Sequence, residues 1–174
     1  IFSMITDDNI IIRKAHEADI DFVADCIIGA EKSGTDVFSY SRIFDIEEDK
    51  FRDILKDVLF EDIEGQELCL SHFLVSELNG ELVCGSCAWV EAEKGQTSNM
   101  IKSSIFSYFL PADKIRKAQP VLKMIQPVHT YRKPGAVQLE GVFVKENMRN
   151  VCNVLLNINE QNKINKKKNK KLTM

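Results

Sequence analysis

The apolar residues near the start of the chain predict one strand followed by two amphipathic helices. Residues 10–15 begin with three isoleucines, a β-branched run that predicts a strand buried on both faces. From residue 20 to residue 30, apolar side chains recur at helical spacing behind an acidic first turn, which favours a helix start. A second helix is predicted over 47–60, where apolar side chains repeat every three or four positions and a polar segment follows.

The middle of the chain predicts a β-hairpin. Residues 72–78 have strand character, Asn79 and Gly80 are typical of a type I′ turn, and 81–91 supply the second strand, which contains Trp89. We expect the two-residue turn to set the register of the hairpin.

After the hairpin, the pattern returns to helical spacing. Residues 100–110 and 112–125 are predicted helices, Pro111 suits a helix start, and Pro120 and Pro127 are predicted breaks. The predicted order is therefore a strand, two helices, a hairpin, a helical insertion, and then the segment described next.

Residues 136–144 are predicted to form a buried strand, followed by the polar turn 145–149 and an apolar helical segment at 150–156. A strand that breaks into a turn and restarts as a helix is a geometry in which the helix N-terminus can receive an anion.

Composition narrows the class of protein. The 174 residues, 44% hydrophobic and 28% charged, predict one globular domain over 10–160 between a short leader, 1–9, and a Lys/Asn-rich tail, 161–174. The formal net charge of -3 argues against a general nucleic-acid binder. No apolar run reaches the roughly 20 residues of a membrane helix, and the leader is too short and too acidic for a signal peptide.

The five cysteines are an odd number and lie mostly in apolar runs, which predicts free thiols in a reducing cytoplasm. Cys84 and Cys87 are three positions apart in a predicted strand, so their side chains point to opposite faces and are poorly placed to share a metal or a disulfide. No His/Cys/Asp spacing indicates a metal site.

Three segments together resemble the GNAT superfamily of acyl-CoA-dependent N-acyltransferases. The segment 10–23, which contains Ile-Arg-Lys-Ala-His-Glu-Ala-Asp, is similar to the family's entry into its first strand and helix. The segment 73–90 resembles its central hairpin, and Leu-Glu-Gly-Val-Phe-Val-Lys-Glu-Asn-Met-Arg-Asn at 139–150 resembles its cofactor strand and the loop that follows. The resemblance implies an α/β (α+β) fold with a mixed, mostly antiparallel sheet flanked by helices.

The resemblance implies acetyl-CoA as co-substrate. In the family, the backbone of the cofactor strand pairs with the pantetheine arm, which here assigns that role to Val142, Phe143 and Val144. The following loop offers backbone N–H groups to the pyrophosphate. Its matching residues are Arg149, Asn150, Val151, Cys152, Asn153 and Val154.

Two departures from the family pattern affect this expectation. Cys152 and Val154 stand where the loop glycines belong, and a β-branched valine disfavours positive φ, so we expect weakened cofactor binding. The family's closing strands also have no evident counterpart after 150, as in a truncated copy.

The candidate chemistry is acetyl transfer to an amine. Glu140 matches a position that is often acidic in the family and is the candidate base, although a sheet-edge carboxylate or a substrate-orienting charge remains an alternative. His129 and Tyr131 are candidates to line the acceptor pocket, with loop packing or solvent exposure as the alternatives. No tyrosine after Tyr131 is present to act as general acid. Aromatic residues at 38–44 and 106–109 shape the acceptor cleft or pack in the core.

Two functions follow. The first is a cytoplasmic N-acetyltransferase acting on a small-molecule or peptide amine. The alternative is an inactive GNAT-like remnant that self-associates, as a homodimer, through the sheet edge at 137–144.

Overall fold

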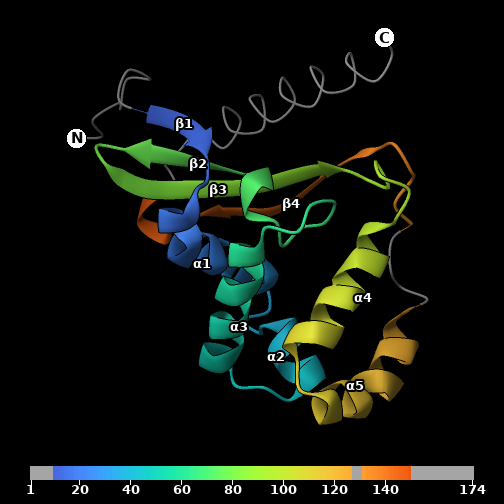
Figure 1. Cartoon of the computed structure of the whole chain (residues 1–174). Helices are drawn as coiled ribbons and strands as arrows, with labels where there is room; N and C mark the ends of the chain where they lie inside the picture. Colours follow the sequence, from blue (N-terminus) through green and yellow to red (C-terminus); the bar gives the residue numbers. More distant parts are fainter. Residues whose placement is uncertain (1–9, 127–130, 150–174) are drawn as a thin grey trace.

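A four-stranded antiparallel sheet and five helices make up an α+β fold (Figure 1). The computed structural model describes residues 10–126 and 131–149. In chain order the elements are β1 (Ile10–Lys14), α1 (Ile20–Glu31), α2 (Ser39–Phe44), α3 (Glu48–Glu61), β2 (Phe73–Leu78), β3 (Glu81–Val90), α4 (Ser98–Phe109), α5 (Ala112–Ile125) and β4 (Val137–Val144). The strands lie in the order β1-β2-β3-β4, and each neighbouring pair is antiparallel.

The five helices lie on one side of the sheet, and α4 and α5 form an insertion between β3 and β4 (Figure 1). Helix α1 packs closely on β4, because Gly29 leaves room for the ring of Phe143: a Cβ at residue 29 would lie 2.3 Å from Phe143 Cε2. This contact positions β4 against the helical layer.

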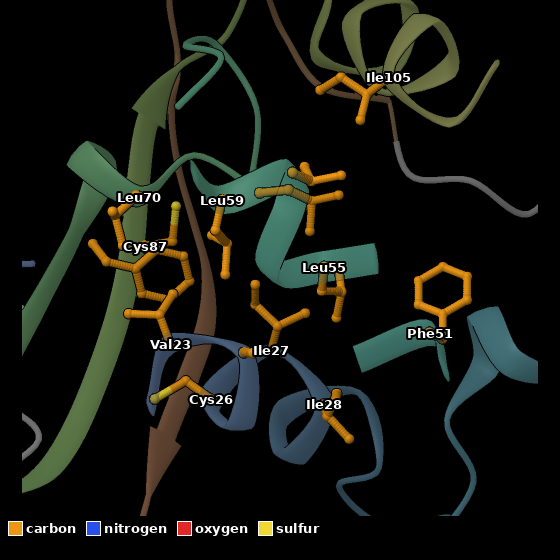
Figure 2. Close-up of a cluster of buried hydrophobic side chains, with 14 of the residues drawn as sticks. Val23, Cys26, Ile27, Ile28, Phe51, Leu55, Leu59, Leu70, Cys87 and Ile105 are labelled. Carbon is orange, nitrogen blue, oxygen red and sulfur yellow. The ribbon is translucent and has the colours of Figure 1, made fainter. Parts of the chain in front are cut away.

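The main core lies between the sheet and the helices α1 and α3. Figure 2 shows Val23 and Ile27 of α1 and Leu55 and Leu59 of α3 lying together beside Cys87 of β3. These side chains are at most 5% exposed. The apolar residues whose helical spacing predicted both helices therefore form the face of each helix that is buried in this core.

Aromatic rings extend the core toward the insertion. The ring centroid of Phe51 lies 5.3 Å from Phe38, 5.7 Å from Tyr40 and 6.2 Å from Phe106, so this cluster joins α2, α3 and α4. Core packing thus accounts for most of these aromatic residues, whereas Tyr108 is 83% exposed.

Two predictions about burial are wrong: that the strand at 10–15 is buried on both faces, and that the strand at 136–144 is buried. β1 and β4 are the outermost strands of the described sheet. Ile11 of β1 is 60% exposed, and Val137 and Leu139 of β4 are 41% and 39% exposed. A strand is buried on both faces only between two layers, and the described helices cover one face of this sheet.

The hairpin forms as predicted, but its turn sets only part of the register. Asn79 and Gly80 have φ of 52° and 82°, as a type I′ turn requires. The turn pairs Leu78 with Glu81, and then the register shifts between Ser76 and Glu77. The shift is a β-bulge, so the expectation that the turn sets the whole register is wrong.

Pro120 does not break a helix, contrary to the sequence prediction, because it lies inside α5. Ala118 on the same helix is 1% exposed, and Ile115 and Leu122 pack against the core. This packing compensates for the hydrogen bond that proline removes from a helix, a loss of about 3 kcal/mol. The other predicted break, Pro127, lies outside the described residues.

The cysteines follow the sequence prediction as far as they are described. Within the described residues, no disulfide joins Cys26, Cys69, Cys84 or Cys87 to another cysteine. Cys87 belongs to the main core, whereas Cys84 packs in a separate cluster with Leu78 and Val83, so the two side chains occupy opposite faces of β3.

Within the described residues, 10–126 and 131–149, no group of His, Cys, Asp and Glu could hold a metal ion. None of the described helices is long and apolar enough to cross a membrane. The leader 1–9, the predicted helical segment 150–156 and the tail 161–174 lie outside the described residues.

Replacing Asp19 by asparagine is expected to lower the free energy of unfolding by about 2–3 kcal/mol at neutral pH. The Asp19 side chain is 4% exposed, binds Arg13 through two hydrogen bonds of 2.6 and 3.0 Å, and accepts the His16 N–H at 2.9 Å. Urea unfolding of the variant and of a control, Asp53→Asn on the exposed face of α3, measures the loss.

The effect of Asp19→Asn is also expected to depend on pH. The hydrogen bond from Arg13 lowers the pKa of Asp19, so the ionised carboxylate stabilises the fold above the pKa of an unfolded aspartate, about 3.9. That contribution is lost as pH falls through the lower pKa of the folded state. A difference between wild type and variant that stays constant from pH 7 to pH 3 contradicts this account.

Candidate functional site

The outermost strand β4 contains a bulge at its centre. Gly85 of β3 pairs with Phe143 and Cys87 pairs with Glu140, so Gly141 and Val142 together lie opposite a single residue of β3. Gly141 has a φ of +61°, and a Cβ at this position would lie 3.1 Å from Phe73 Cζ. Both the backbone conformation and the space at the bulge therefore favour glycine.

A cavity of about 210 Å³ lies beside the bulge. It is formed by α1, α2, the loop before β2 and the bulge itself. Its lining residues are Ile27, Ala30, Glu31, Tyr40, Glu67, Leu68, Glu140 and Gly141. The walls are apolar apart from three carboxylates and a phenol, so a polar ligand in the cavity would meet mainly acidic groups.

Glu140 combines access to the cavity with an altered proton affinity. Its side chain is 37% exposed, and its Oε1 accepts a hydrogen bond from Arg132 Nη2. Burial and the negative charge of Glu67 raise the pKa of Glu140, while Arg132 opposes the rise. Glu140 is therefore a stronger base than a glutamate in open solvent.

The guanidinium of Arg132 is held on several sides. It lies over the ring of Trp89, 5.4 Å from the ring centroid, and its Nη1 donates to Ser98 Oγ at 3.0 Å and to Asn99 Oδ1 at 3.3 Å. Burial disfavours the charge, but Glu67 and Glu140 outweigh burial and raise the pKa of Arg132. Arg132 is thus a fixed cation between the start of α4 and the bulge strand.

Glu91, the residue that follows β3, supports the same corner of the site. Its carboxylate accepts hydrogen bonds from Trp89 Nε1 at 3.2 Å and from the Ser98 backbone N–H at 2.9 Å. Burial opposes ionisation, but these hydrogen bonds lower the pKa of Glu91. The carboxylate holds together the ring and the helix start that contact Arg132.

A second cation, Lys102 of α4, lies on the other side of Glu67. Its Nζ pairs with Glu67 Oε1 and lies 3.3 Å from the Tyr40 hydroxyl. Burial raises the pKa of Tyr40 to about 12. The other oxygen, Glu67 Oε2, accepts no hydrogen bond from the described residues and lies 3.9 Å from Arg132 Nη1. Glu67 therefore connects Lys102 electrostatically to Arg132 and Glu140.

A larger cavity of about 540 Å³ lies between α2, α4 and α5. Tyr40, Asn99 and Lys102 are among its lining residues, and Tyr40 also lines the smaller cavity. Tyr40 thus contacts both cavities, whereas Asn99 and Lys102 line only the larger one.

The structure places four of the candidate site residues on β4. Glu140 lines the cavity, and Val142, Phe143 and Val144 lie on the outermost strand. The ring of Phe143 packs against Gly29, so this residue offers its backbone rather than its side chain to a ligand.

The remaining candidate residues lie away from the cavity or outside the described residues. Tyr131 is 81% exposed and is not among the lining residues. Arg149 follows the 3-10 turn Glu146–Met148, at the end of the described segment. The candidates outside the described residues are His129, Asn150, Val151, Cys152, Asn153 and Val154.

Sequence reasoning missed Glu67, Lys102 and Arg132. Glu67 and Lys102 are 35 positions apart, and each sits in a segment whose local pattern resembles an ordinary charged surface. Arg132 and Glu140 are only eight positions apart, which is close enough for a pattern in the sequence to connect them. Helix and strand periodicities do not relate a loop residue to a strand residue, however, so this pair was missed as well.

Comparisons of the chain with protein-family models, with curated proteins and with solved structures found no match.

Replacing Gly141 by alanine is expected to lower the free energy of unfolding by about 1–3 kcal/mol and to change the shape of the bulge. The positive φ and the 3.1 Å approach to Phe73 both oppose a Cβ. Gly95→Ala is the matched control, because Gly95 has a φ of +87° with nothing within 4 Å. Urea unfolding measures stability, and equal losses in the two variants would contradict the role of the Phe73 contact.

Proposed function

We propose that the protein is an N-acetyltransferase that moves an acetyl group from acetyl-CoA to an amine. The observation that carries the proposal is the bulge in β4, which sets Glu140 at a cavity beside an outermost strand. The sequence resemblance to the GNAT superfamily assigns the cofactor to this same strand.

The open edge of β4 supports acetyl-CoA as the cofactor. β4 is the last strand in the sheet order, and no described strand pairs with its outer edge, so backbone groups there are available to an extended pantetheine arm. Val142, Phe143 and Val144 would hold that arm, and Arg149 with the segment up to Val154 would hold the phosphates. Acetyl-CoA supplies an acetyl group activated as a thioester.

Glu140 has the properties that the transfer requires of a proton acceptor. An amine attacks a carbonyl carbon only through its neutral nitrogen, so a base must take the ammonium proton before attack or the nitrogen proton after it. Burial and the charge of Glu67 raise the pKa of Glu140, which makes its carboxylate a better acceptor than an exposed one. Glu31 and Glu67 line the same cavity and favour a cationic acceptor over an anionic one.

The test of the proposal is binding of acetyl-CoA. A ligand present at 100 times its Kd stabilises the native state by about 2.7 kcal/mol, so acetyl-CoA at millimolar concentration is expected to raise the melting temperature. Adenosine 3′,5′-bisphosphate, which lacks the pantetheine arm, is the control and should give a smaller shift. No shift at any acetyl-CoA concentration, together with no acetylated product from a panel of amines, would overturn the proposal.

The acceptor in this proposal is a small-molecule or peptide amine, and the free thiols favour a cytoplasmic location. The smaller cavity, about 210 Å³, has room for only a limited part of an acceptor. We therefore expect primary amines with a slender reactive end to be the best substrates.

A second candidate function is self-association of a catalytically inactive domain through β4. Val137, Leu139 and Val142 on this outermost strand are 41%, 39% and 36% exposed. Apolar side chains on an open strand favour pairing with a second copy. Light scattering should then report a dimer that Leu139→Lys converts to a monomer, whereas a monomeric wild type would exclude this candidate.

A further inference from the structure

We propose that Arg132 is a positioning residue that holds the Glu140 carboxylate at the cavity, and that the first turn of α4 holds Arg132 in place. The inference rests on the proposed function, because Glu140 is the base there. The inference also assigns a role to the helical insertion between β3 and β4, which is to hold Arg132 in place.

The contacts of Arg132 form a continuous path from the insertion to β4. One nitrogen, Nη1, binds Ser98 and Asn99 at the start of α4, and the other, Nη2, binds Glu140 Oε1. The guanidinium carbon also lies over the Trp89 ring, 5.4 Å from its centroid, a cation–π contact that limits where the group can lie. A guanidinium held by this contact and by the hydrogen bonds of one nitrogen has little freedom left, so the second nitrogen defines where the Glu140 carboxylate lies.

Arg132 is positioned by groups that are themselves buried. Ser98 is 0% exposed, Trp89 1% and Glu91 1%, and Glu91 binds both the Trp89 ring nitrogen and the Ser98 backbone. The Arg132 side chain is 18% exposed. A carboxylate in solvent on an outermost strand would sample several rotamers, whereas this arrangement selects one.

Several charged or titratable groups face Glu140 from the elements around it. Arg132 comes from the loop before β4, Glu67 from the loop before β2, and Lys102 from α4. Cys87 is the β3 partner of Glu140, and Glu31 of α1 and Tyr40 of α2 line the same cavity. Of these, Arg132 is the only described residue in an ion pair with Glu140, and it opposes the rise in the pKa of Glu140, so its removal is expected to raise that pKa further.

The experiment compares three substitutions. Arg132→Gln removes the positive charge and the planar set of N–H donors, whereas Arg132→Lys keeps the charge but loses that planar set. Asn99→Ala removes one hydrogen-bond acceptor of the guanidinium, and Asn99 is an exposed residue of α4. Arg52→Gln is the matched control, because Arg52 also binds two aspartates, Asp21 and Asp25, but on the surface formed by α1 and α3. Two readouts are taken: the pH profile of kcat/KM, and the carboxyl titration of Glu140 by carbon NMR, assigned with Glu140→Gln.

We expect Arg132→Gln to move the acid limb of the profile, and the NMR titration of Glu140, upward by about 1–3 pH units. Arg132→Lys should leave the limb near its wild-type position but lower kcat/KM by about 10- to 100-fold, because a lysine cannot orient the carboxylate. Asn99→Ala should lower kcat/KM by a smaller factor without moving the limb. Arg52→Gln should change neither readout.

An unchanged NMR titration of Glu140 in Arg132→Gln would overturn the inference, as would full activity in both Arg132→Lys and Asn99→Ala. The NMR titration needs no substrate, and Asn99→Ala alters an exposed side chain that should not prevent folding. A wild-type protein that transfers no acetyl group but shows the expected NMR shift in Arg132→Gln would overturn the proposed function and leave the contact between Arg132 and Glu140 established.

Discussion

Replacing Glu140 by glutamine is expected to lower kcat/KM for acetyl transfer by about 10²- to 10⁴-fold. Glutamine has nearly the same shape and still accepts a hydrogen bond from Arg132, but its amide cannot take a proton from the amine. Release of the CoA thiol, followed with a thiol-reactive dye, measures the rate. Because the cavity keeps its shape, the affinity for acetyl-CoA should change little.

The control for this variant is Glu17→Gln, which alters an exposed carboxylate before α1. It should keep the wild-type rate. If Glu140→Gln retains more than half of the wild-type kcat/KM, Glu140 is not the base, and its role reduces to one of orientation at the sheet edge.

The rate of acetyl transfer by the wild-type protein is expected to depend on pH through Glu140. A base works only when ionised, and burial together with Glu67 raises the pKa of Glu140. The rate should therefore fall on the acid side with a midpoint above about 4.3, the ordinary value for glutamate. Glu140→Gln should lack this acid limb in whatever rate remains.

Replacing Phe51 by alanine is expected to lower the free energy of unfolding by about 3–5 kcal/mol. Phe51 is 0% exposed, and its ring lies within 6.3 Å, centroid to centroid, of Phe38, Tyr40, Phe44 and Phe106. Deleting the ring removes the group that all four contact and leaves a cavity that rigid neighbours fill poorly. Domains are stable by about 5–15 kcal/mol, so the loss is a large fraction of the total.

The matched control is Phe60→Ala, in the same helix α3. Phe60 is 63% exposed, so its removal should change the free energy of unfolding by less than about 0.5 kcal/mol. Urea unfolding at constant pH measures both variants. If both variants lose the same free energy of unfolding, the contacts of Phe51 in the aromatic cluster add nothing to the stability of the fold.

The local elements of the fold were predictable because their signals lie within a few residues. Asn79 and Gly80 have the positive φ angles of a type I′ turn, and few other residue pairs adopt them at low cost. The apolar residues of α1 and α3 repeat at the spacing that brings them to one side of a helix. The opposite orientations of Cys84 and Cys87 follow from strand geometry.

Predictions failed where a competing long-range contact decides the outcome. Pro120 is tolerated in α5 because Ile115, Ala118 and Leu122 pack on the core, and no local rule includes that packing. The isoleucines of β1 and the valines of β4 indicate strands equally well at a sheet edge and at its centre, so their exposure depended on strand order.

For the candidate site, too, some features follow from local sequence and others from long-range contacts. The sequence by itself determined the elements, the hairpin and the position of Glu140 on a strand, because propensity, periodicity and turn chemistry act between near neighbours. Only the tertiary structure decided that β4 is outermost and bulged at Gly141, and that Arg132, Glu67 and Lys102 surround one carboxylate. Those charges come from segments far apart in the chain, and their effect on Glu140 depends on distance and burial, which exist only once the chain has folded.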